Sequence, residues 1–415
     1  MPLKGCNVAS IWIVKQYGST PDLPGGTRQF ELAQSLAKRG CEVTYFLSSF
    51  HYLLQEEVKL RAGERFRVER QNGFNLVWIK GFPYERNDWR RVVNAVDYAK
   101  RFYLLGKKIT RLQPTVKVPN AVLAFNLPLL TPLCAYLLSK KYGAKFFLEV
   151  GDLWPQTLID MGELNEQSLI ASFLRSIEKL LYRRAQRILT PLPYISEYPS
   201  LDKFKNKIIS IGSGIDLSNY RNSTKIPDKK NESFKLLYLG AHGPANDLSN
   251  VLNAFNRIQN LGFSEIKLIL VGHGVAKDAL VREAQDMKLR NLGFENAVPK
   301  NKVPEIIATA DACLFSLKKA SVFSYGINPN KLADYLGSGK PIVFAADVRN
   351  NIVKETGCGL AVRAGEPKEL ADAIIKLYRM PPRDRATMGY RGRKYAEKYL
   401  DSEKVTDNLV EILDL

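Results

Sequence analysis

The chain has 415 residues, of which 45% are hydrophobic and 25% charged. This composition is typical of a globular protein and excludes a disordered or low-complexity chain, and the length suits two domains of about 200 residues each. The net charge of +19 favours an anionic partner, either nucleic acid, an anionic membrane surface or a phosphorylated substrate.

The pattern of apolar residues in the first half of the chain predicts alternating strands and helices. A buried strand over 8–14 leads through a loop rich in glycine and proline to an amphipathic helix over 28–38, which ends at Gly40. A strand over 42–47 completes a βαβ unit and therefore requires a parallel sheet. Later strands are expected at 75–79, 122–125, 145–150 and 187–190, and helices at 89–110, 131–141 and 167–185.

Two segments of the first half hold much of the positive charge. Residues 85–117 contain nine Lys or Arg against three acids, and residues 171–187 contain five against one. The helix over 89–110 is also amphipathic, so the basic segments 86–111 and 175–187 are candidates for contact with an anionic membrane surface. The alternative is a stripe of apolar side chains that faces the core beside solvated charges.

The second half repeats the alternation. Strands are expected at 234–239, 266–271, 312–317, 341–345 and 360–362, with a helix over 247–259. We predict an N-terminal domain of residues 1–217, a polar linker over 218–233 and a C-terminal domain of residues 234–395. A last helix, within 396–415, is expected to pack back on the N-terminal domain. Two doubly wound parallel sheets would bind ligands at the carboxyl ends of their strands, in a cleft between the domains.

Glycine-rich loops follow the first strand of each half. Gly25 and Gly26 precede the helix over 28–38, and a Gly-Ala-His-Gly loop runs from Gly240 to Gly243. Glycine lets a backbone approach a ligand closely, and a helix N-terminus favours an anion. His242 within the second loop either polarises a phosphate or is a solvated loop side chain.

An acidic pair ends the strand over 145–150. Glu149 and Asp152 follow a buried strand, where they could orient a sugar hydroxyl or act as a base. The alternative for Asp152 is that it caps a helix.

Residues 325–344 combine a loop, a short helix and a buried strand. Asn330 is expected to cap a helix that carries Lys331 and Asp334 on one side and that ends at Gly337 and Gly339. The lysine could meet a phosphate, and the aspartate could accept hydrogen bonds from ribose hydroxyls. The alternative is an ordinary junction with a surface ion pair.

Metal and redox chemistry have little support in the sequence. The five cysteines are scattered, the three histidines have no metal-ligand spacing, and no two aspartates are two residues apart. We therefore expect no metal and no resident cofactor. The cysteines favour a reducing compartment, and the start of the chain has no secretory signal. The expected location is the cytoplasm, either free or peripheral on the inner face of the plasma membrane.

Seven motifs in order resemble the GT-B fold glycosyltransferases of family 4, and among them the bacterial O-antigen and capsule polysaccharide transferases similar to WbuB. The motifs are residues 24–28, 37–44, 152–155, 181–188, 211–216, 270–274 and 325–344. The resemblance implies a fold of two Rossmann-like domains that face a central cleft.

The resemblance also implies an activity. It is that of a retaining, metal-independent transferase that moves a sugar from a nucleotide-diphosphate donor, usually UDP-linked, to a lipid-linked or saccharide acceptor. The donor would bind the second domain and the acceptor the first. The catalytic candidates are the residues argued for above from their own positions, namely Asp152, Glu149 and His242. The donor contacts that the resemblance implies are Gly25, Gly26, Ala297, Val298, Gly326, Ile327, Asn328, Lys331 and Asp334. Gly240, Gly243 and Leu332 are further candidates for donor contact.

The chain departs from the family pattern at three positions. Gly326 stands where the family usually has a first glutamate, eight residues before Asp334. Ala241 and Asn246 stand where an arginine and a lysine are common. We expect Lys331 and His242 to compensate for the missing cations.

Two other functions fit parts of the sequence. A UDP-sugar 2-epimerase has the same fold, but it usually relies on histidines, of which this chain has three. A basic protein that binds nucleic acid would fit the charge, but the basic segments contain no nucleic-acid motif, so we expect no nucleic-acid partner.

Overall fold

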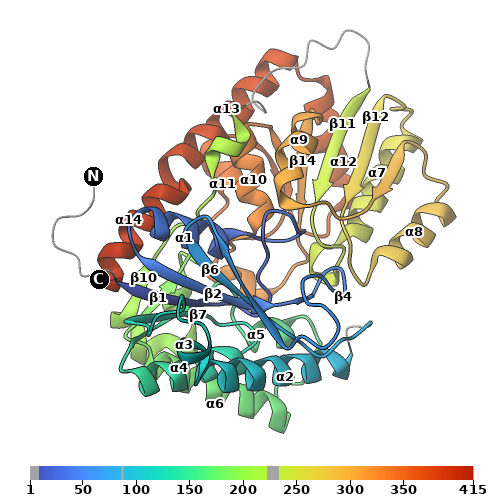
Figure 1. Ribbon diagram of the computed structural model, residues 1–415. Coiled ribbons are helices and arrows are strands. Elements are labelled where there is room, and N and C mark those ends of the chain that lie inside the picture. The colour runs from blue at the N-terminus through green and yellow to red at the C-terminus, as the bar shows by residue number, and fades with distance from the viewer. Residues whose placement is uncertain (1–8, 86–87, 222–232, 415) are drawn as a thin grey trace. The chain divides into compact units, whose positions relative to one another are not determined.

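The computed structural model describes residues 9–85, 88–221 and 233–414 (Figure 1). The chain divides into two compact units. Unit 1 comprises the residues up to Thr20, Gly26–Gly214 and those from Ser402, and unit 2 comprises Pro21–Gly25 and Ile215–Asp401. The short loop Pro21–Gly25 groups with unit 2 because the backbone N–H of Lys300 donates to the Leu23 carbonyl at 3.0 Å.

Unit 1 contains an eight-stranded sheet in the order β10-β9-β8-β7-β1-β2-β6-β5. Every described pairing in it is parallel except that of β5 with β6. The strands are β1 Ser10–Val14, β2 Glu42–Ser48, β5 Phe66–Gln71, β6 Phe74–Ile79, β7 Ala121–Phe125, β8 Lys145–Glu149, β9 Arg187–Thr190 and β10 Ile208–Ser210. The expected strands of this half are therefore confirmed within one or two residues.

Short or half-exposed strands were not predicted. β5 is the antiparallel edge of the sheet, and none of its residues is fully buried. β3 Phe50–His51 and β4 Glu56–Glu57 form a separate two-stranded hairpin. Strands of this kind carry little hydrophobic periodicity, which is why the sequence pattern did not reveal them.

Helices cover both faces of this sheet. In Figure 1, α2 and α4 lie on the opposite side from α1 and α14. The helices are α1 Arg28–Lys38, α2 Trp89–Gly106, α3 Ile109–Leu112, α4 Leu130–Tyr142, α5 Gln156–Asp160, α6 Leu169–Arg184 and α14 Ser402–Leu413, with 3-10 turns η1 Ile195–Glu197 and η2 Pro199–Lys207. The helix predicted over 89–110 ends at Gly106, and α3 follows as a separate turn.

Unit 2 contains a six-stranded parallel sheet in the order β13-β12-β11-β14-β15-β16. Its strands are β11 Phe234–Leu239, β12 Ile266–Val271, β13 Leu292–Glu295, β14 Ala312–Ser316, β15 Ile342–Ala345 and β16 Gly359–Val362. Its helices are α7 Leu248–Asn260, α8 Lys277–Asp286, α9 Val303–Ala308, α10 Asn330–Ser338, α11 Ile352–Thr356, α12 Pro367–Arg379 and α13 Pro382–Tyr399, with turns η3 Leu217–Tyr220, η4 Pro244–Asn246, η5 Lys300–Lys302 and η6 Ser321–Tyr325.

The sheet of unit 2 is buried on both faces. Leu236 and Tyr238 of β11 belong to a core shared with α7 and α12, while Leu237 between them belongs to a second core shared with α9, α10 and α13. Alternate strand residues point to opposite faces. The continuous apolar strands of the sequence therefore follow from burial on both sides, as expected for parallel sheets.

The unit boundaries differ by a few residues from the domain limits set out above. Ile215 already belongs to unit 2, where its N–H donates to the Leu400 carbonyl at 2.7 Å and Tyr220 is buried. Most of the predicted linker, 222–232, lies outside the described residues. At the other end, α13 reaches Tyr399, and the chain then enters unit 1 with α14.

Helix α14 is attached to α1 within unit 1. Arg39, at the end of α1, pairs with Glu403 at 2.8 Å and with Asp407 at 2.6 Å. Among the helices that the structure describes, none combines the length and the hydropathy of a membrane span.

Candidate functional site

Both sheets reverse their strand order beside their first strand. In unit 1, β1 lies between β2 and β7, and in unit 2, β11 lies between β12 and β14. Ligands of doubly wound sheets bind outside the carboxyl ends of the strands at such a switch point. The loops that follow β1 and β11 are therefore where the functional side chains are expected.

Lys331 lies at the switch point of unit 2. Its Nζ donates to the Tyr238 hydroxyl at 2.7 Å and to Asn246 Oδ1 at 2.5 Å, and it lies 4.4 Å from the centre of the Tyr238 ring. These partners are neutral, and no carboxylate among the described residues pairs with the amine. Burial lowers the pKa of Lys331 to about 7. The position therefore holds a buried amine that lacks a counter-charge.

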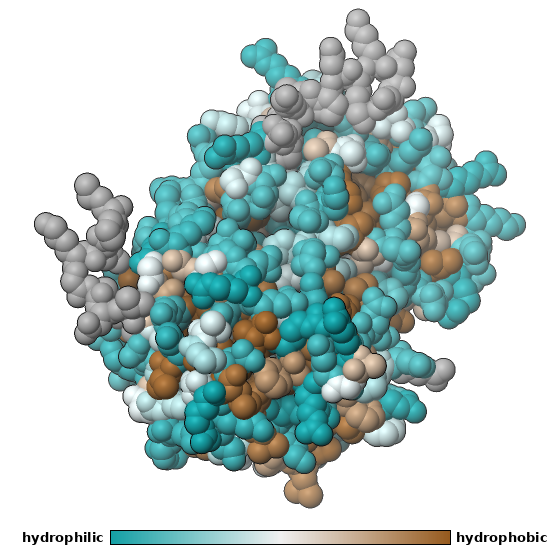
Figure 2. All heavy atoms as spheres, viewed as in Figure 1, coloured by the Kyte–Doolittle hydropathy of each residue, from teal (hydrophilic) through white to brown (hydrophobic). Residues whose placement is uncertain are grey.

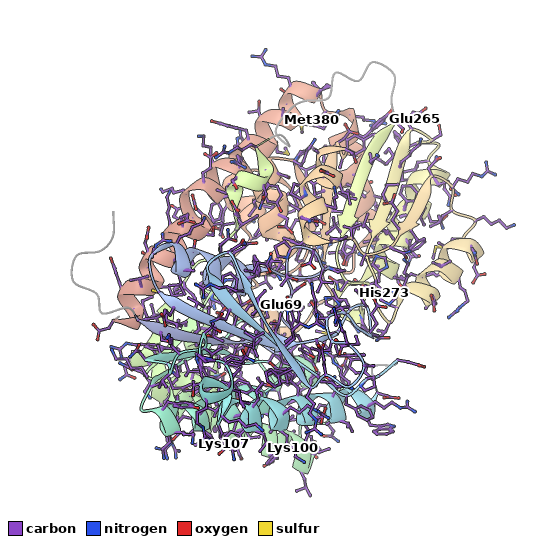
Figure 3. The ribbon with its side chains drawn as sticks, viewed as in Figure 1. Glu69, Lys100, Lys107, Glu265, His273 and Met380 are labelled. Atoms are coloured by element: carbon purple, nitrogen blue, oxygen red, sulfur yellow. The ribbon has the colours of Figure 1, made fainter. Side chains whose placement is uncertain are left out.

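The glycine loop after β11, Gly240–Gly243, lies beside this amine. A Cβ added to Gly240 would lie 2.9 Å from Cε of Lys331, so a side chain there would displace the lysine. A Cβ on Gly272, in the loop after β12, would collide with the Gly240 carbonyl. The two loops are also joined by the His242 N–H, which donates to the His273 carbonyl at 2.9 Å, and Figure 3 shows His273 beyond the end of β12.

His242 is fully buried under this loop. Burial is the main cause that lowers its pKa to about 4, and Lys277 and Lys331 act in the same direction. Neither ring nitrogen has a hydrogen-bond partner among the described residues. The alternative of a solvated loop side chain is therefore wrong, and His242 is a buried imidazole whose lowered pKa keeps it neutral.

Asp334 has different partners from Lys331. Both of its oxygens accept from Lys300 Nζ, at 2.5 and 2.7 Å, and Oδ1 also accepts from the Tyr220 hydroxyl at 2.8 Å. The side chain is 4% exposed. The pair is buried, so the alternative of a surface ion pair is wrong. The structure adds Lys300 and Tyr220, which the sequence did not single out.

Helix α10 begins and ends differently from the prediction. Its N-cap residue is Pro329, and Asn330 is the first helical residue and makes no capping hydrogen bond through its side chain. Proline at the cap fixes the backbone without a side-chain cap. Gly337 lies inside the helix, and Gly339 alone ends it in the left-handed conformation with φ of +70°.

Some of the predicted donor contacts in and just before α10 already make contacts within unit 2. Gly326 has φ of +104°, a region that favours glycine, which gives a backbone reason for the absence of an acid there. The N–H of Ile327 donates to Asn350, whose amide donates back to the Ile327 carbonyl, both at 3.2 Å. Leu332 is buried in the second core of unit 2. The N–H of Ile327 and the side chain of Leu332 therefore have structural roles, and Asn328 directly follows Ile327 in the loop before α10.

Ala297 and Val298 lie in the half-buried segment after β13. Lys277 fixes the start of this segment, because its Nζ donates to Asn296 Oδ1 at 2.8 Å and to the Gly272 carbonyl at 3.3 Å. The sequence did not single out Lys277, and its position in the first turn of α8 gave no special signal.

The other glycine pair lies at the entry to α1. Gly25 has φ of +109° and ends the loop that groups with unit 2, whereas Gly26 is the first residue of the next segment of unit 1. The Thr27 hydroxyl then hydrogen-bonds to Glu31 at 2.6 Å as α1 begins.

A buried polar cluster occupies the switch point of unit 1. Glu149, at the end of β8, accepts hydrogen bonds from Arg28 and, at 3.2 Å, from Gln29. Arg28 also donates to the Gly212 carbonyl at 2.9 Å. Glu149 is 2% exposed, so its carboxylate orients Arg28 and the first turn of α1. It does not face the solvent as a free base would.

Lys15 extends this cluster toward Asp152. Its Nζ donates to Gln29 Oε1 at 2.7 Å and lies 4.6 Å from the centre of the Phe125 ring. Burial is the main cause that lowers the pKa of Lys15 to about 8. The residue directly follows β1, and a lysine at the end of an otherwise apolar strand was the signal that the sequence analysis missed.

Asp152 keeps solvent contact at the edge of the cluster. The surrounding protein atoms raise the pKa of Asp152 to about 6, although Lys15 acts in the opposite direction. The N-cap of the following helix, α5, is Pro155, and that helix has no side-chain cap. The capping alternative is therefore wrong, and Asp152 is an accessible carboxyl group that can change protonation near neutral pH.

The amphipathic helix α2 divides its apolar side chains between the core and the surface. Ala99 and Phe102 are buried, whereas Trp89 and Val92 are each 64% exposed and Val96 is 46% exposed. The core-facing interpretation therefore holds for part of the helix only, and contact with a membrane stays a prediction. Its second half packs in the core, and its first half presents apolar side chains to the solvent.

No three His, Cys, Asp or Glu side chains come together as a metal-binding group within residues 9–85, 88–221 and 233–414.

Comparison with known proteins links this geometry to sugar transfer. Residues 233–380, which make up most of unit 2, match the family model described as glycosyl transferases group 1. Over 412 residues, the chain is 23% identical to the putative colanic acid biosynthesis glycosyl transferase WcaI of Escherichia coli K12, covering 93% of this chain and 95% of that protein. The resemblance to WbuB in particular stays a prediction.

Solved structures share the fold along nearly the whole chain. Sucrose-phosphate synthase of Thermosynechococcus elongatus has a TM-score of 0.73 at 14% identity, covering 97% of this chain and 98% of its own. HepE of Anabaena, solved in complex with UDP and glucose, has a TM-score of 0.67 at 15% identity, covering 97% and 99%. The predicted fold, two parallel α/β domains of the GT-B type, is confirmed.

Proposed function

From the premise that this chain is a GT-B glycosyltransferase with a group 1 domain in residues 233–380, we propose that it moves a sugar from a UDP-linked donor to a lipid-linked saccharide. The pathway would be the synthesis of a bacterial surface polysaccharide, as the name of its relative WcaI suggests. Transfer would retain the anomeric configuration and would need no metal ion. The donor would bind unit 2 and the acceptor unit 1.

The observation that carries the proposal is the unneutralised amine of Lys331 at the end of β11. Among the described residues, its Nζ donates hydrogen bonds to the neutral Tyr238 and Asn246 and to no acid. Gly240 leaves the backbone beside this amine free of side chains. A diphosphate would supply the missing negative charge, and a lysine acts on phosphate as a point charge. In this proposal, Lys331 and the N-terminus of α10 stabilise the leaving diphosphate in the absence of a metal.

In this proposal, the sugar acceptor binds at the switch point of unit 1. Asp152 is the accessible carboxyl group of its switch point, with Lys15 beside it. It would orient the attacking hydroxyl group, and the leaving phosphate would accept the proton in a displacement on one face of the sugar. Glu149 would act indirectly, by holding Arg28 in place.

An anionic membrane surface would be the second partner, because a lipid-linked acceptor lies in a bilayer. Helix α4 contacts both α2 and α6, and Figure 2 shows apolar side chains at the surface over these helices, among hydrophilic ones. On α6, Leu169, Ile170 and Phe173 are 89%, 64% and 59% exposed. Figure 3 labels Lys100 of α2 and Lys107, the residue that directly follows this helix. Exposed apolar side chains beside cations fit a leaflet of anionic lipid, on the inner face of the plasma membrane.

The test uses the purified full chain and a panel of nucleotide sugars with EDTA present. We expect UDP-sugars to raise the melting temperature by mass action, and UDP release to accelerate when a saccharide acceptor is added. Lys331→Met should abolish the thermal shift, whereas Lys302→Met, an exposed lysine two residues beyond Lys300, should leave it intact. Equal shifts in both variants would contradict the donor assignment. Formation of an epimer from the UDP-sugar alone would identify a 2-epimerase instead.

A further inference from the structure

Strand β5 is an open edge of the sheet in unit 1. It is the last strand in the order of this sheet, and among the described strands it pairs with β6 alone. The turn between them is Asn72 and Gly73, with φ of +51° and +86°, and such a two-residue turn fixes the register of the hairpin. An edge strand presents a row of unpaired backbone N–H and C=O groups, to which another strand can bond.

The backbone groups that point away from β6 belong to Phe66, Val68 and Arg70. The N–H of Lys80 donates to the Arg65 carbonyl at 3.1 Å, and in an antiparallel pair every second residue bonds to the partner strand. The odd-numbered residues of β5 therefore bond to β6, and the even-numbered ones face outward. Among the described residues, none makes a backbone hydrogen bond to these three from outside the hairpin.

The side chains of β5 leave this edge open to pairing. Edge strands are often blocked by proline, by a bulge or by like charges, whereas β5 has no proline and pairs with β6 without a break. Arg67 and Glu69, which Figure 3 labels, lie on one face of the strand and are 28% and 34% exposed. Arg67 Nη2 holds Glu64 at 2.6 Å, but Nη1 lies 3.8 Å from Glu69, beyond a hydrogen bond. Each of the two charges therefore retains capacity for a partner.

One antiparallel register of β5 with a second copy of itself matches these charges. When Val68 lies opposite Val68 of the second copy, Arg67 of each strand faces Glu69 of the other. These are non-hydrogen-bonded pairs, whose side chains lie closest, and opposite charges stabilise such pairs. Phe66 then faces Arg70, a cation–π combination. Sliding one strand by two residues in either direction brings two arginines or two glutamates face to face.

We infer that β5 is a self-association surface, through which two copies of this chain join their unit 1 sheets into one continuous sheet. The occupant of the open edge is the same strand of the second copy, because β5 is complementary to itself in charge. The inference does not depend on the proposed function. A single strand pair is a small interface, so the dimer forms reversibly as the concentration rises.

The test is sedimentation velocity of the full chain from micromolar to submillimolar concentration. We expect the mass to rise from that of one chain, 46.8 kDa, toward that of two. Arg67→Glu places two glutamates face to face on each side of the dimer and should raise its Kd about tenfold or more. Glu69→Arg should do the same by opposing arginines. Combining both changes restores opposite charges and should restore the dimer.

Two further variants separate pairing at β5 from a general effect of charge. Lys267→Glu alters an exposed residue of β12, a strand with neighbours on both sides, and should dimerise like the unchanged chain. Val68→Pro removes an outward N–H that the pairing with β6 does not use, and it should abolish the dimer. Thermal unfolding of every variant checks that the fold is intact.

A chain that stays monomeric at all concentrations would overturn the inference. A dimer that both single charge reversals leave unchanged, or that the double variant does not restore, would also overturn it, because that dimer uses another surface. If Val68→Pro fails to fold, the charge series still decides. Slower hydrogen exchange in residues 66–71 at high concentration, lost in Arg67→Glu, would place the contact on β5.

Discussion

Lys300 holds both carboxylate oxygens of Asp334, at 2.5 and 2.7 Å, across 34 residues of chain. Asp334, which the sequence analysis assigned to a ribose, is therefore already part of an ion pair. This pair joins the turn η5 to helix α10. Three of the roughly four acceptor sites of a carboxylate are used by Lys300 and Tyr220, so one remains for a ligand hydroxyl.

Breaking this pair should destabilise the protein. In Lys300→Met, the buried carboxylate of Asp334 loses its cation, and we expect the free energy of unfolding to fall by about 3 kcal/mol. Lys302→Met breaks the exposed pair with Glu305 and should cost less than about 1 kcal/mol. Urea unfolding of both variants measures the difference. Similar midpoints would show that Asp334 does not depend on Lys300.

The first turn of α1 offers a matched comparison within unit 1. Glu149→Ala leaves the buried Arg28 without its carboxylate, and we expect a loss of about 3–5 kcal/mol. Arg39→Ala breaks the bonds to Glu403 and Asp407, whose side chains are 48% and 64% exposed, and should cost about 1 kcal/mol. If the two variants unfold at the same urea concentration, the buried pair has no special role.

Donor binding should take up a proton at Lys331. The pKa of this amine is lowered to about 7, so at a pH of about 8 most free protein carries it neutral. A bound diphosphate favours the ammonium form, and binding should then take up about 0.9 proton. At a pH of about 5.5 the amine is already protonated and uptake should vanish. Calorimetry in buffers of different ionisation enthalpy measures this value, and an uptake that persists in Lys331→Met would assign the proton to another group.

Activity should decline in acid because of Asp152. Its pKa is raised to about 6, and only the ionised carboxylate can accept a hydrogen bond from the attacking hydroxyl. The rate should therefore fall as the pH drops through about 6. Asp152→Asn should lower kcat by about 10²- to 10⁴-fold and remove this acidic limb from the pH–rate profile. An unchanged limb would exclude Asp152 from the proposed role.

Membrane binding should depend on the exposed apolar residues of α2 and α6. A variant with Val92→Ser and Leu169→Ser should float less with vesicles that contain anionic lipid than the unchanged chain does, because it loses buried apolar area at the bilayer. Leu261→Ser alters a residue of unit 2 that is 60% exposed and should float normally. Equal flotation of all three proteins, or flotation with neutral vesicles alone, would refute the membrane proposal.

The sequence revealed most of the fold because its signals are local. The apolar strands and the amphipathic helices of both units appear where their periodicity places them, and β1, α1 and β2 match within two residues. The exceptions are β5, β10 and β13, short or half-exposed strands at or near the sheet edges, and the two-residue strands β3 and β4 of the separate hairpin. Edge strands bury less, so their sequences alternate less clearly.

The candidate site was predictable only in part. The glycine loop at Gly240 and the amine of Lys331 lie together, as their positions after β11 and at the start of α10 suggested. Lys277 and Lys300 were missed because a single lysine gives no pattern in the sequence, whereas Lys15 was marked only by its place at the end of an apolar strand. The state of His242, buried and neutral, was also undecidable from its neighbours along the chain.

By itself the sequence determined the two α/β halves and the order of motifs that resembles family 4 glycosyltransferases, because backbone periodicity and loop chemistry depend on neighbouring residues. Only the tertiary structure decided which charges meet. Lys300 reaches Asp334, Arg28 reaches Glu149 and Lys331 reaches no acid among the described residues. These pairings depend on which strand ends and helix starts lie close together in the fold. Packing brings together residues that are 34 or 121 positions apart, and local sequence patterns do not encode such contacts.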